Sequence, residues 1–269
     1  MLKTEMRNEK SMQIDRMTTS EMLHLMQDEY VAAAYAVERE LDAVGRAVDE
    51  ISARMKQGGR LFYVGCGTSG RLGVLDASEC PPTYGVPHGL VVGIIAGGET
   101  AIRRAVEGAE DDRACGRGDL LSHSLTPLDS VVGISVAGGA AYVLGALEYA
   151  SELGAFTVAL TCNEGTLLEA LADVAIHPDT GAEVVTGSTR MKAGSAHKMI
   201  LNMISTSVMI KLGHVYQNLM INLRPTNVKL RDRMIRIVCD MIDVRYEEAE
   251  RLLEENEFDI RRAVEAYKK

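Results

Sequence analysis

The sequence lacks the features that would mark an exported or membrane protein. No apolar run approaches the roughly 18 residues that a membrane-spanning helix needs. The polar start, Met1–Asn8, does not resemble a signal peptide. The five cysteines are scattered, without a Cys-x-x-Cys pair or a zinc-ligand spacing. We therefore expect a cytoplasmic protein without disulfide bonds, a bound metal or a membrane segment.

Positive charge is also scarce. The chain has 29 Lys and Arg against 38 Asp and Glu, which gives a net charge of −9. This balance argues against general nucleic-acid binding, although a phosphate still fits a pocket that is locally positive. An apolar content of 46% and a charged content of 25% are ordinary for a globular protein. The 269 residues suffice for one large α/β domain with a small appendage.

From Arg60 onward, short apolar runs alternate with helical patterns. Strands are expected at 60–65, 89–95, 130–135, 155–161 and 173–177. Helices are expected at 69–78, 99–109, 139–153, 165–172 and 192–212. This alternation predicts an α/β fold of three αβα layers, a flavodoxin-like parallel sheet with helices on both faces. Ligands of such folds bind at the carboxyl ends of the strands.

Helical patterns flank this region on both sides. A capping box at Thr18–Glu21 starts one N-terminal helix, and a second helix is expected over about 29–57. Beyond Pro225, short helical patterns at about 227–241, 246–254 and 258–268 predict a small three-helix bundle. We therefore divide the chain into an N-terminal helical segment (1–57), an α/β domain (58–225) and a helical appendage (226–269).

The stretch Arg60–Gly73 joins a predicted strand to a predicted helix through a glycine-rich loop. Its glycines permit a tight turn and a close approach of backbone to a ligand, and Ser69 is positioned to cap the helix. Free N–H groups and the helix dipole at such an end favour an anion. We therefore predict a phosphate bound by Gly67, Thr68, Ser69 and Gly70.

Three other interpretations of this loop compete with a phosphate site. It matches the dinucleotide fingerprint G-x-G-x-x-G, but the next strand runs into Ala96–Gly98 where that fingerprint requires an acidic residue. It is not a Walker loop, because no Gly-Lys-Ser/Thr follows. The simplest alternative is an ordinary tight turn between a strand and a helix.

The stretch Leu75–Pro82 contains the first candidate catalytic acid. Pro81 and Pro82 are expected to end the helix at about Cys80, which places Glu79 in its last turn. The helix dipole disfavours negative charge there, so Glu79 is a candidate general acid. The alternative is a solvated glutamate near a helix end.

The stretch Ala105–Asp112 contains four acidic residues within six positions, at the end of another predicted helix. Glu110 would lie beyond the carboxyl end of the second strand, at the same edge of the sheet as the glycine loop. Two carboxylates that face one pocket can divide acid and base roles. The alternative is a solvated run of charge.

A second candidate anion site lies at Thr186–Gly194, before a long apolar helix. Ser188 or Thr189 would cap this helix, and its N–H groups together with Arg190 and Lys192 would bind the anion. The alternative is an ordinary cap with incidental basic residues.

Together these motifs resemble those of the N-acetylmuramic acid 6-phosphate etherases, a family built on a sugar isomerase (SIS) domain. Asp-Ala-Ser-Glu-Cys-Pro-Pro at 76–82 and Thr-Gly-Ser-Thr-Arg at 186–190 are highly specific. The resemblance covers nearly the whole chain, from Arg7-Asn8 to Val215–Met220. The related glucokinase regulatory proteins share the architecture and bind sugar phosphates without catalysis.

The resemblance implies cleavage of the D-lactyl ether of N-acetylmuramate 6-phosphate to N-acetylglucosamine 6-phosphate and D-lactate, in cell-wall sugar recycling. It implies that Glu79 is the proton donor and Glu110 the second catalytic glutamate, with no metal or redox cofactor. It also implies a homodimer with the pocket near the subunit interface, and a UBA-like C-terminal bundle. The matching residues that would hold phosphate and sugar are Thr68, Ser69, Ser188, Thr189 and Arg190.

The loop after the third strand departs from the family pattern. The family usually has Ser-Gly-Arg-Thr-Pro-Tyr, whereas residues 137–142 are Ala-Gly-Gly-Ala-Ala-Tyr. A guanidinium and two hydroxyls are lost from a loop expected to touch the phosphate, which predicts weaker binding and weakened activity. Two alternative functions therefore stay open: a non-catalytic sugar-phosphate-binding regulator, and an aldose–ketose sugar-phosphate isomerase.

Overall fold

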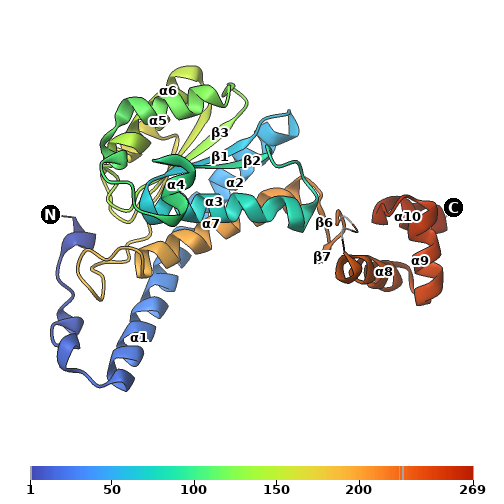
Figure 1. Cartoon of the computed structure of the whole chain (residues 1–269), viewed down its shortest axis with the longest axis horizontal. Helices are drawn as coiled ribbons and strands as arrows, with labels where there is room; N and C mark the ends of the chain where they lie inside the picture. Colours follow the sequence, from blue (N-terminus) through green and yellow to red (C-terminus); the bar gives the residue numbers. More distant parts are fainter. Residues whose placement is uncertain (1, 224, 226, 269) are drawn as a thin grey trace. The chain divides into compact units, whose positions relative to one another are not determined.

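The computed structural model describes residues 2–223, 225 and 227–268 (Figure 1). By its internal contacts the chain divides into two compact units. The first comprises the chain up to Ala77 together with Gly89–Val208, and the second comprises Ser78–His88 and the chain from Met209 onward. The predicted three-part division stays a prediction, and its boundary at residue 226 lies outside the described residues.

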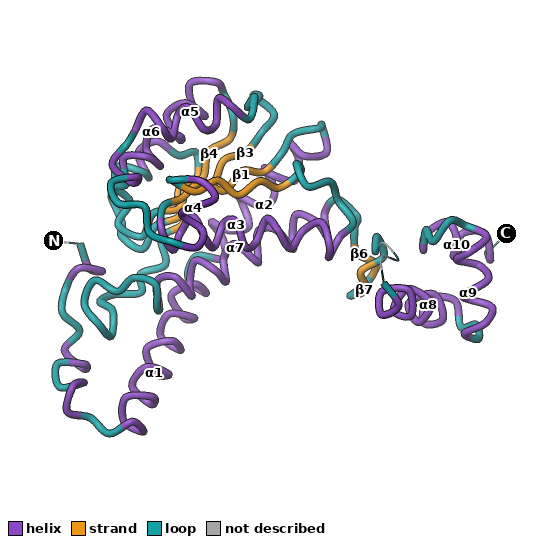
Figure 2. The backbone as a smooth tube through the Cα atoms, in the orientation of Figure 1, coloured by secondary structure: helices purple, strands orange, loops and turns teal. Residues whose placement is uncertain are grey.

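The first unit is built on a five-stranded parallel sheet with the strand order β2-β1-β3-β4-β5 (Figure 2). All five predicted strands are confirmed: β1 (Leu61–Gly65), β2 (Val91–Ile95), β3 (Ser130–Ile134), β4 (Phe156–Leu160) and β5 (Val174–Ile176). Every residue of β1, β3 and β4 is buried, as expected for apolar strands covered on both faces. In this order, β1 and β3 are neighbours at the point where the chain reverses its direction across the sheet, which is where ligands bind in such folds.

Helices cover both faces of the sheet, which confirms the three αβα layers. One face carries α5 (Arg113–Ser122) and α6 (Ala141–Leu153), and the other carries α2 (Leu41–Lys56), α3 (Gly67–Tyr84) and α7 (Lys192–Lys211) (Figures 1 and 2). On the α6 face, Phe62 and Val64 share a buried cluster with Val143 and Leu147. Short α4 (Gly98–Arg103) follows β2.

The join between β1 and α3 depends on two glycines. A Cβ on Gly65 would lie 2.7 Å from the amide nitrogen of Gly70, and a Cβ on Gly70 would lie 2.6 Å from the carbonyl oxygen of Gly65. Side chains at either position would force the strand and the helix apart. The close contact keeps the start of α3 directly against the end of β1.

The N-terminal region differs from the expectation in two ways. The capping box at Thr18 is confirmed, but it starts a helix, α1 (Thr19–Glu38), that ends before α2 instead of a single helix over 29–57. Glu40 at the joint accepts a hydrogen bond from the amide of His177 at 3.0 Å, which anchors the break to the end of β5. The segment before α1 forms three 3-10 turns, η1 (Lys3–Glu5), η2 (Glu9–Ser11) and η3 (Ile14–Arg16).

Three further helix predictions need correction. Helix α3 does not end at Cys80 but continues through Pro81 and Pro82 to Tyr84, although proline removes a backbone donor and its ring crowds the preceding turn of a helix. The helix predicted at 99–109 ends at Arg103, and the one predicted at 165–172 is a 3-10 turn, η5 (Glu169–Leu171). Helix α5 was not predicted.

The second unit contains a two-stranded antiparallel sheet, β6 (Val215–Tyr216) and β7 (Leu219–Met220), and three helices. Helices α8 (Val228–Ile242), α9 (Tyr246–Glu255) and α10 (Ile260–Tyr267) match the predicted bundle closely. They enclose their own core, which includes Ile235, Leu253 and Ile260. Among the described residues, no helix is both long and apolar enough to span a membrane.

Candidate functional site

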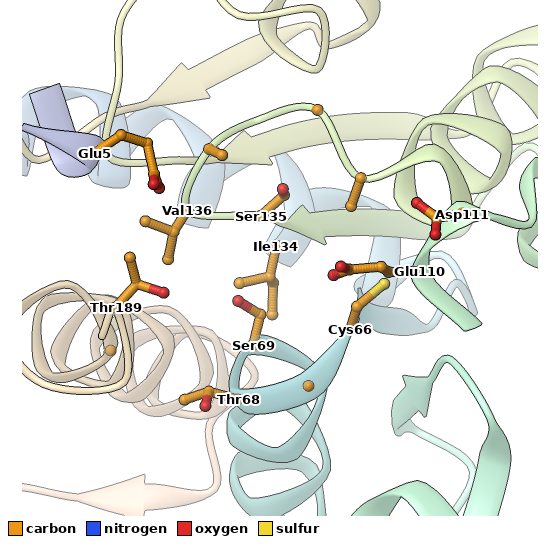
Figure 3. A pocket seen from close by; sticks show the side chains of 15 residues that line it. Glu5, Cys66, Thr68, Ser69, Glu110, Asp111, Ile134, Ser135, Val136 and Thr189 are labelled. Atoms are coloured by element: carbon orange, nitrogen blue, oxygen red, sulfur yellow. The ribbon is translucent and has the colours of Figure 1, made fainter. Parts of the chain in front are cut away.

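A cavity of about 390 Å³ opens at the carboxyl ends of β1 and β3 (Figure 3). This volume falls within the range of small-molecule pockets. The walls come from the β1–α3 loop, the β3–α6 loop and the 3-10 turn η4 (Ala109–Asp111), with Thr189 and Gly194 from the α7 region. All of these elements belong to the first unit.

The β1–α3 wall contains the predicted phosphate loop. Gly67 adopts a φ of +51°, which favours glycine, and the side chains of Thr68 and Ser69 line the cavity. Because α3 begins at Gly67, Ser69 lies inside its first turn and is not the expected cap. Ser69 is 8% exposed, and its hydroxyl has no hydrogen-bond partner within the described part of the chain. Gly70 does not line the cavity and serves the close contact with Gly65.

The β3–α6 wall contains the departure from the family pattern. Ala137, Gly139 and Ala140 line the cavity without offering a polar side-chain atom. Ser135 also lines it, is 7% exposed, and has a hydroxyl with no side-chain partner among residues that the structure describes. Ala140 is the N-cap residue of α6 and makes no side-chain capping bond. Ala140 thus brings the start of α6 to the cavity, as Gly67–Ser69 bring the start of α3.

Three residues of the predicted acidic run have two different roles. Glu110 and Asp111, on η4, line the cavity beside the phosphate loop. Asp112 instead caps α5, because its side chain accepts a hydrogen bond from the amide of Cys115 at 2.9 Å. Burial, followed by the charges of Glu110 and Asp111, raises the pKa of the Cys66 thiol to about 12, so Cys66 stays a neutral thiol beside Glu110.

Glu5 also lines the cavity, and the sequence analysis did not single it out. It belongs to η1, in the segment before α1. In Figure 3 its carboxylate and that of Glu110 point into the cavity from different sides. Three carboxylates therefore line the cavity, and none of its described lining residues is Lys or Arg.

At the second predicted anion site, the first amides of α7 are bound by acceptors from the chain itself. The amides of Lys192 and Ala193, which begin α7, donate to the carboxylate of Glu183 at 3.2 and 3.0 Å. The next amide, that of Gly194, donates to the carbonyl of Thr189 at 2.9 Å. The start of α7 is thus closed by Glu183, a fully buried residue, and not by the hydroxyl of Ser188 or Thr189.

The predicted phosphate contacts of this motif are dispersed. Thr189 lines the main cavity, whereas Arg190 lines a neighbouring cavity of about 420 Å³ that shares Thr68 and Gly194 with it. Ser188 is not among the lining residues of either cavity. The Lys192 ammonium, in a side chain that is only 5% exposed, forms an ion pair with buried Glu29 and lines neither cavity.

Glu29 is bound by several donors. Lys10 donates to it at 2.8 Å and Asn8 at 2.9 Å, in addition to Lys192. Burial alone would raise the pKa of Glu29, but the hydrogen bonds from Lys10 and Lys192 outweigh it and hold the pKa below its ordinary value. Burial raises the pKa of Glu183, with the amides of Ala193 and Lys192 opposing it.

The predicted partner of Glu110 is Glu79, which belongs to the other compact unit. Glu79 is exposed on α3, within Ser78–His88 of the second unit, and is not among the lining residues of the described cavity. The pairing of Glu79 with Glu110 therefore stays a prediction. Among the described residues, no group of three or more His, Cys, Asp or Glu side chains is arranged to hold a metal ion.

Comparison with known proteins gives consistent matches. A family model of the glucokinase regulatory protein N-terminal SIS domain matches residues 43–151. An N-acetylmuramic acid 6-phosphate etherase from Caldanaerobacter subterraneus subsp. tengcongensis is 54% identical over 261 residues, 97% of this chain and 85% of that protein. One from Clostridium beijerinckii is 52% identical over 263 residues, 98% of this chain and 86% of that protein.

Among solved structures, the chain resembles a phosphoheptose isomerase from Francisella tularensis. The TM-score is 0.59 at 18% identity, over 72% of this chain and 100% of that one. A phosphoheptose isomerase from Neisseria gonorrhoeae gives a TM-score of 0.54 at 19% identity, over 71% and 98%. At these identities the likeness establishes the SIS fold alone.

Proposed function

The chain belongs to the N-acetylmuramic acid 6-phosphate etherase family, and on this premise we propose that it cleaves the D-lactyl ether of N-acetylmuramate 6-phosphate in the cytoplasm. The products are N-acetylglucosamine 6-phosphate and D-lactate. The observation that carries the proposal is the position of Glu110, which shares one cavity with Thr68 and Ser69 at the edge of the sheet. A reacting carboxylate and a phosphate loop on one cavity suit a phosphorylated substrate.

The phosphate is assigned to the side of the cavity where donors gather. Ser69 and Ser135 offer two buried hydroxyls, and the starts of α3 and α6 offer backbone N–H groups. Thr68 faces both this cavity and the neighbouring one that contains Arg190, so a phosphate at Thr68 lies toward the positive side chain. Lys192 is left out of these contacts, because its ammonium is bound to Glu29.

The chemistry requires an acid, a base and water, but no redox step. In the ring-opened sugar the C2 proton lies α to the C1 aldehyde, so a carboxylate base removes it. Lactate then leaves from C3 with a proton from a carboxylic acid, and water adds to the unsaturated aldehyde. Glu110 is assigned to the C2 proton and the water, and Glu79 to the departing lactate. The phosphate contacts keep C2 and C3 in position for these steps.

The site is assigned to a homodimer, in which Glu79 of the partner subunit completes the cavity. Glu79 is exposed in the single chain and does not line the cavity that contains Glu110. Large apolar side chains on α1 are also exposed, including Leu23 and Tyr35 at 61% and 60%. Such side chains on one helix are typical of a surface that another chain covers.

A second candidate function is a sugar-phosphate-binding regulator without turnover. The observation that favours it is the β3–α6 loop, whose Ala137, Gly139 and Ala140 give the cavity no polar side-chain atom. An isomerase of the same fold is a third candidate, and it would interconvert amino-sugar phosphates without releasing lactate.

One experiment separates these functions. The purified protein is incubated with N-acetylmuramate 6-phosphate, and D-lactate is measured with a coupled dehydrogenase, beside Glu79→Gln and Glu110→Gln. Wild type releases lactate, and each variant alone loses at least about a hundredfold in rate. A wild type that binds the sugar phosphate and releases no more lactate than the variants would support the regulator instead.

The same two variants test the shared site. If each cavity uses Glu110 of one chain and Glu79 of the other, mixed dimers regain one intact site. A refolded one-to-one mixture then recovers about a quarter of the wild-type activity, because about half of the dimers are mixed. No recovery in a mixture shown to contain mixed dimers would place both glutamates of each site in one chain.

A further inference from the structure

The segment Lys3–Asn8 forms part of the wall of the cavity through a single side chain, that of Glu5. We infer that Glu5 contacts the substrate, and that its carboxylate accepts hydrogen bonds from hydroxyl groups of the bound sugar on the side of the cavity away from the phosphate. This inference rests on the proposed function, because it names how the same cavity binds its sugar. It requires that the segment is held in place, that Glu5 is free to bind, and that a phosphate does not lie beside it.

The segment is anchored on one side of Glu5 by a fully buried threonine. The side-chain amide of Asn163 donates to the hydroxyl of Thr4 at 3.0 Å and to the carbonyl of Val136 at 3.0 Å. The amide of Thr4 lies 3.5 Å from the side-chain oxygen of the same asparagine. Val136 lines the cavity, so Asn163 joins the segment directly to the β3–α6 wall.

A second anchor lies on the other side of Glu5. The side-chain amide of Asn8 donates to Glu29 at 2.9 Å and to the carbonyl of Ala182 at 3.3 Å. Lys10 donates to the same glutamate at 2.8 Å. Since Glu29 is buried beside the start of α7, this anchor is also tied to the body of the first unit. Glu5 thus lies between two fixed points.

Glu5 is the charged residue of this segment that faces the cavity without a protein partner. Lys3, in this segment, forms an ion pair with Asp179, and Lys10, which follows it, forms one with Glu29. Within the described residues, the Glu5 carboxylate has no hydrogen bond or ion pair, and no Lys or Arg lines the cavity to offset its charge. A carboxylate held there without a protein donor is suited to donors that a ligand brings.

The charges of the cavity indicate which part of the ligand lies beside Glu5. A phosphate dianion would be repelled by the carboxylate, whereas sugar hydroxyls donate to it in strong charge-assisted bonds. In Figure 3 the carboxylates of Glu5 and Glu110 lie on different sides of the cavity. A sugar in the cavity would therefore be held from two sides, with Glu5 orienting its hydroxyls while Glu110 faces the reacting carbons.

The test compares Glu5→Gln and Glu5→Ala with a matched control, Glu9→Gln, an exposed glutamate directly after this segment that does not line the cavity. Binding of N-acetylglucosamine 6-phosphate and of inorganic phosphate is measured by calorimetry, and the KM and kcat of lactate release by the coupled assay. Both Glu5 variants weaken binding of the sugar phosphate and raise KM by about tenfold or more. Inorganic phosphate binding and the melting temperature stay at the wild-type values, and Glu9→Gln behaves as wild type.

Two outcomes overturn the inference. In the first, sugar-phosphate affinity in both Glu5 variants stays within about twofold of wild type, so that Glu5 makes no contact of consequence. In the second, the affinities for inorganic phosphate and sugar phosphate fall together, which indicates a structural role of the segment. Failure of the proposed function has a different signature, since wild type itself would then release no lactate while the binding measurements would still report on Glu5.

Discussion

Helix α3 begins with Gly-Thr-Ser-Gly, and the similar sequence Gly-Ser-Thr-Arg at 187–190 precedes α7. The first N–H groups of the two helices nevertheless have different surroundings. At α3, the first turn lines the cavity, and the hydroxyl of Ser69 is buried there without a protein partner among the described residues. At α7, the carboxylate of Glu183 accepts the first two amides. One helix start is open to a ligand, and the other is already occupied by an anion that the chain supplies.

The difference shows why a glycine and hydroxyl motif before a helix does not by itself identify an anion site. Glu183 lies nine residues before Lys192, outside the motif, and is fully buried. Its carboxylate takes the place that a bound phosphate would take at a free helix end. The decisive residue is therefore one that the motif does not contain.

The largest expected effect in this comparison is on stability, at the start of α7, where Glu183 accepts the helix amides. Glu183→Ala leaves two buried amides without an acceptor and opens a cavity at the start of α7, so we expect a loss of about 3 kcal/mol in the free energy of unfolding. Urea denaturation measures it. Glu265→Ala, at an exposed glutamate of α10, is the control and should change the free energy by less than about 0.5 kcal/mol. A Glu183→Ala loss as small as the control's would mean that α7 is not closed by this carboxylate.

At the start of α3, which lines the cavity, the expected effect is on substrate affinity. Ser69→Ala removes a buried hydroxyl that faces the cavity, and it should raise KM about tenfold, because a hydrogen bond to a charged group contributes about 1.5–3 kcal/mol. Ser188→Ala, at the equivalent motif of α7, should leave KM within about twofold of wild type. Steady-state lactate release measures both. The reverse order of the two variants would assign the phosphate to the start of α7.

The smallest expected effect is on the pH dependence of stability, through two carboxylates near the start of α7. Burial raises the pKa of Glu183, so the folded protein holds this proton more tightly than the unfolded chain does. The contribution of Glu183 to the free energy of unfolding is fully present below the ordinary pKa of 4.5, and it is lost as pH rises through the pKa of the folded state. For Glu29 the pKa is lowered, so its contribution is present above 4.5 and is lost as pH falls through the folded-state value.

Unfolding free energies of Glu183→Gln and Glu29→Gln, measured from about pH 3 to pH 8, test these signs. The advantage of wild type over Glu183→Gln should decline as pH rises, and its advantage over Glu29→Gln should decline as pH falls. Slopes of the same sign for both variants would contradict the assignment of opposite shifts to two carboxylates beside one helix.

The sheet was predictable because its signal is local. Continuous apolar runs such as Leu61–Val64 are long enough to identify a strand buried on both faces, and the spacing of the helices then fixes a parallel order. The break between α1 and α2 has no such signal, since Glu38–Leu41 contains neither glycine nor proline. It depends instead on Glu40, which reaches the amide of His177 at the end of β5.

The site was predictable only in part, for the same reason. Thr68 and Ser69 directly follow β1, and Glu110 lies in the connection after β2, so the topology of the sheet brings them to one edge. Glu5 reaches the cavity through bonds between Thr4 and Asn163, residues 159 positions apart, and no spacing within the sequence reports such a contact. The continuation of α3 through Pro81 likewise depends on packing that overrides the local preference.

The cavity's uneven distribution of charge has a consequence for inhibitor chemistry. Carboxylates, without a balancing cation among the described lining residues, occupy part of its wall, while hydroxyls and helix starts occupy another. A compound that joins a protonated amine to an acidic group at about the spacing of a hexose would satisfy both parts simultaneously. Sugar-like zwitterions are therefore better starting points for blocking this pocket than the purely anionic mimics that a phosphate site usually invites.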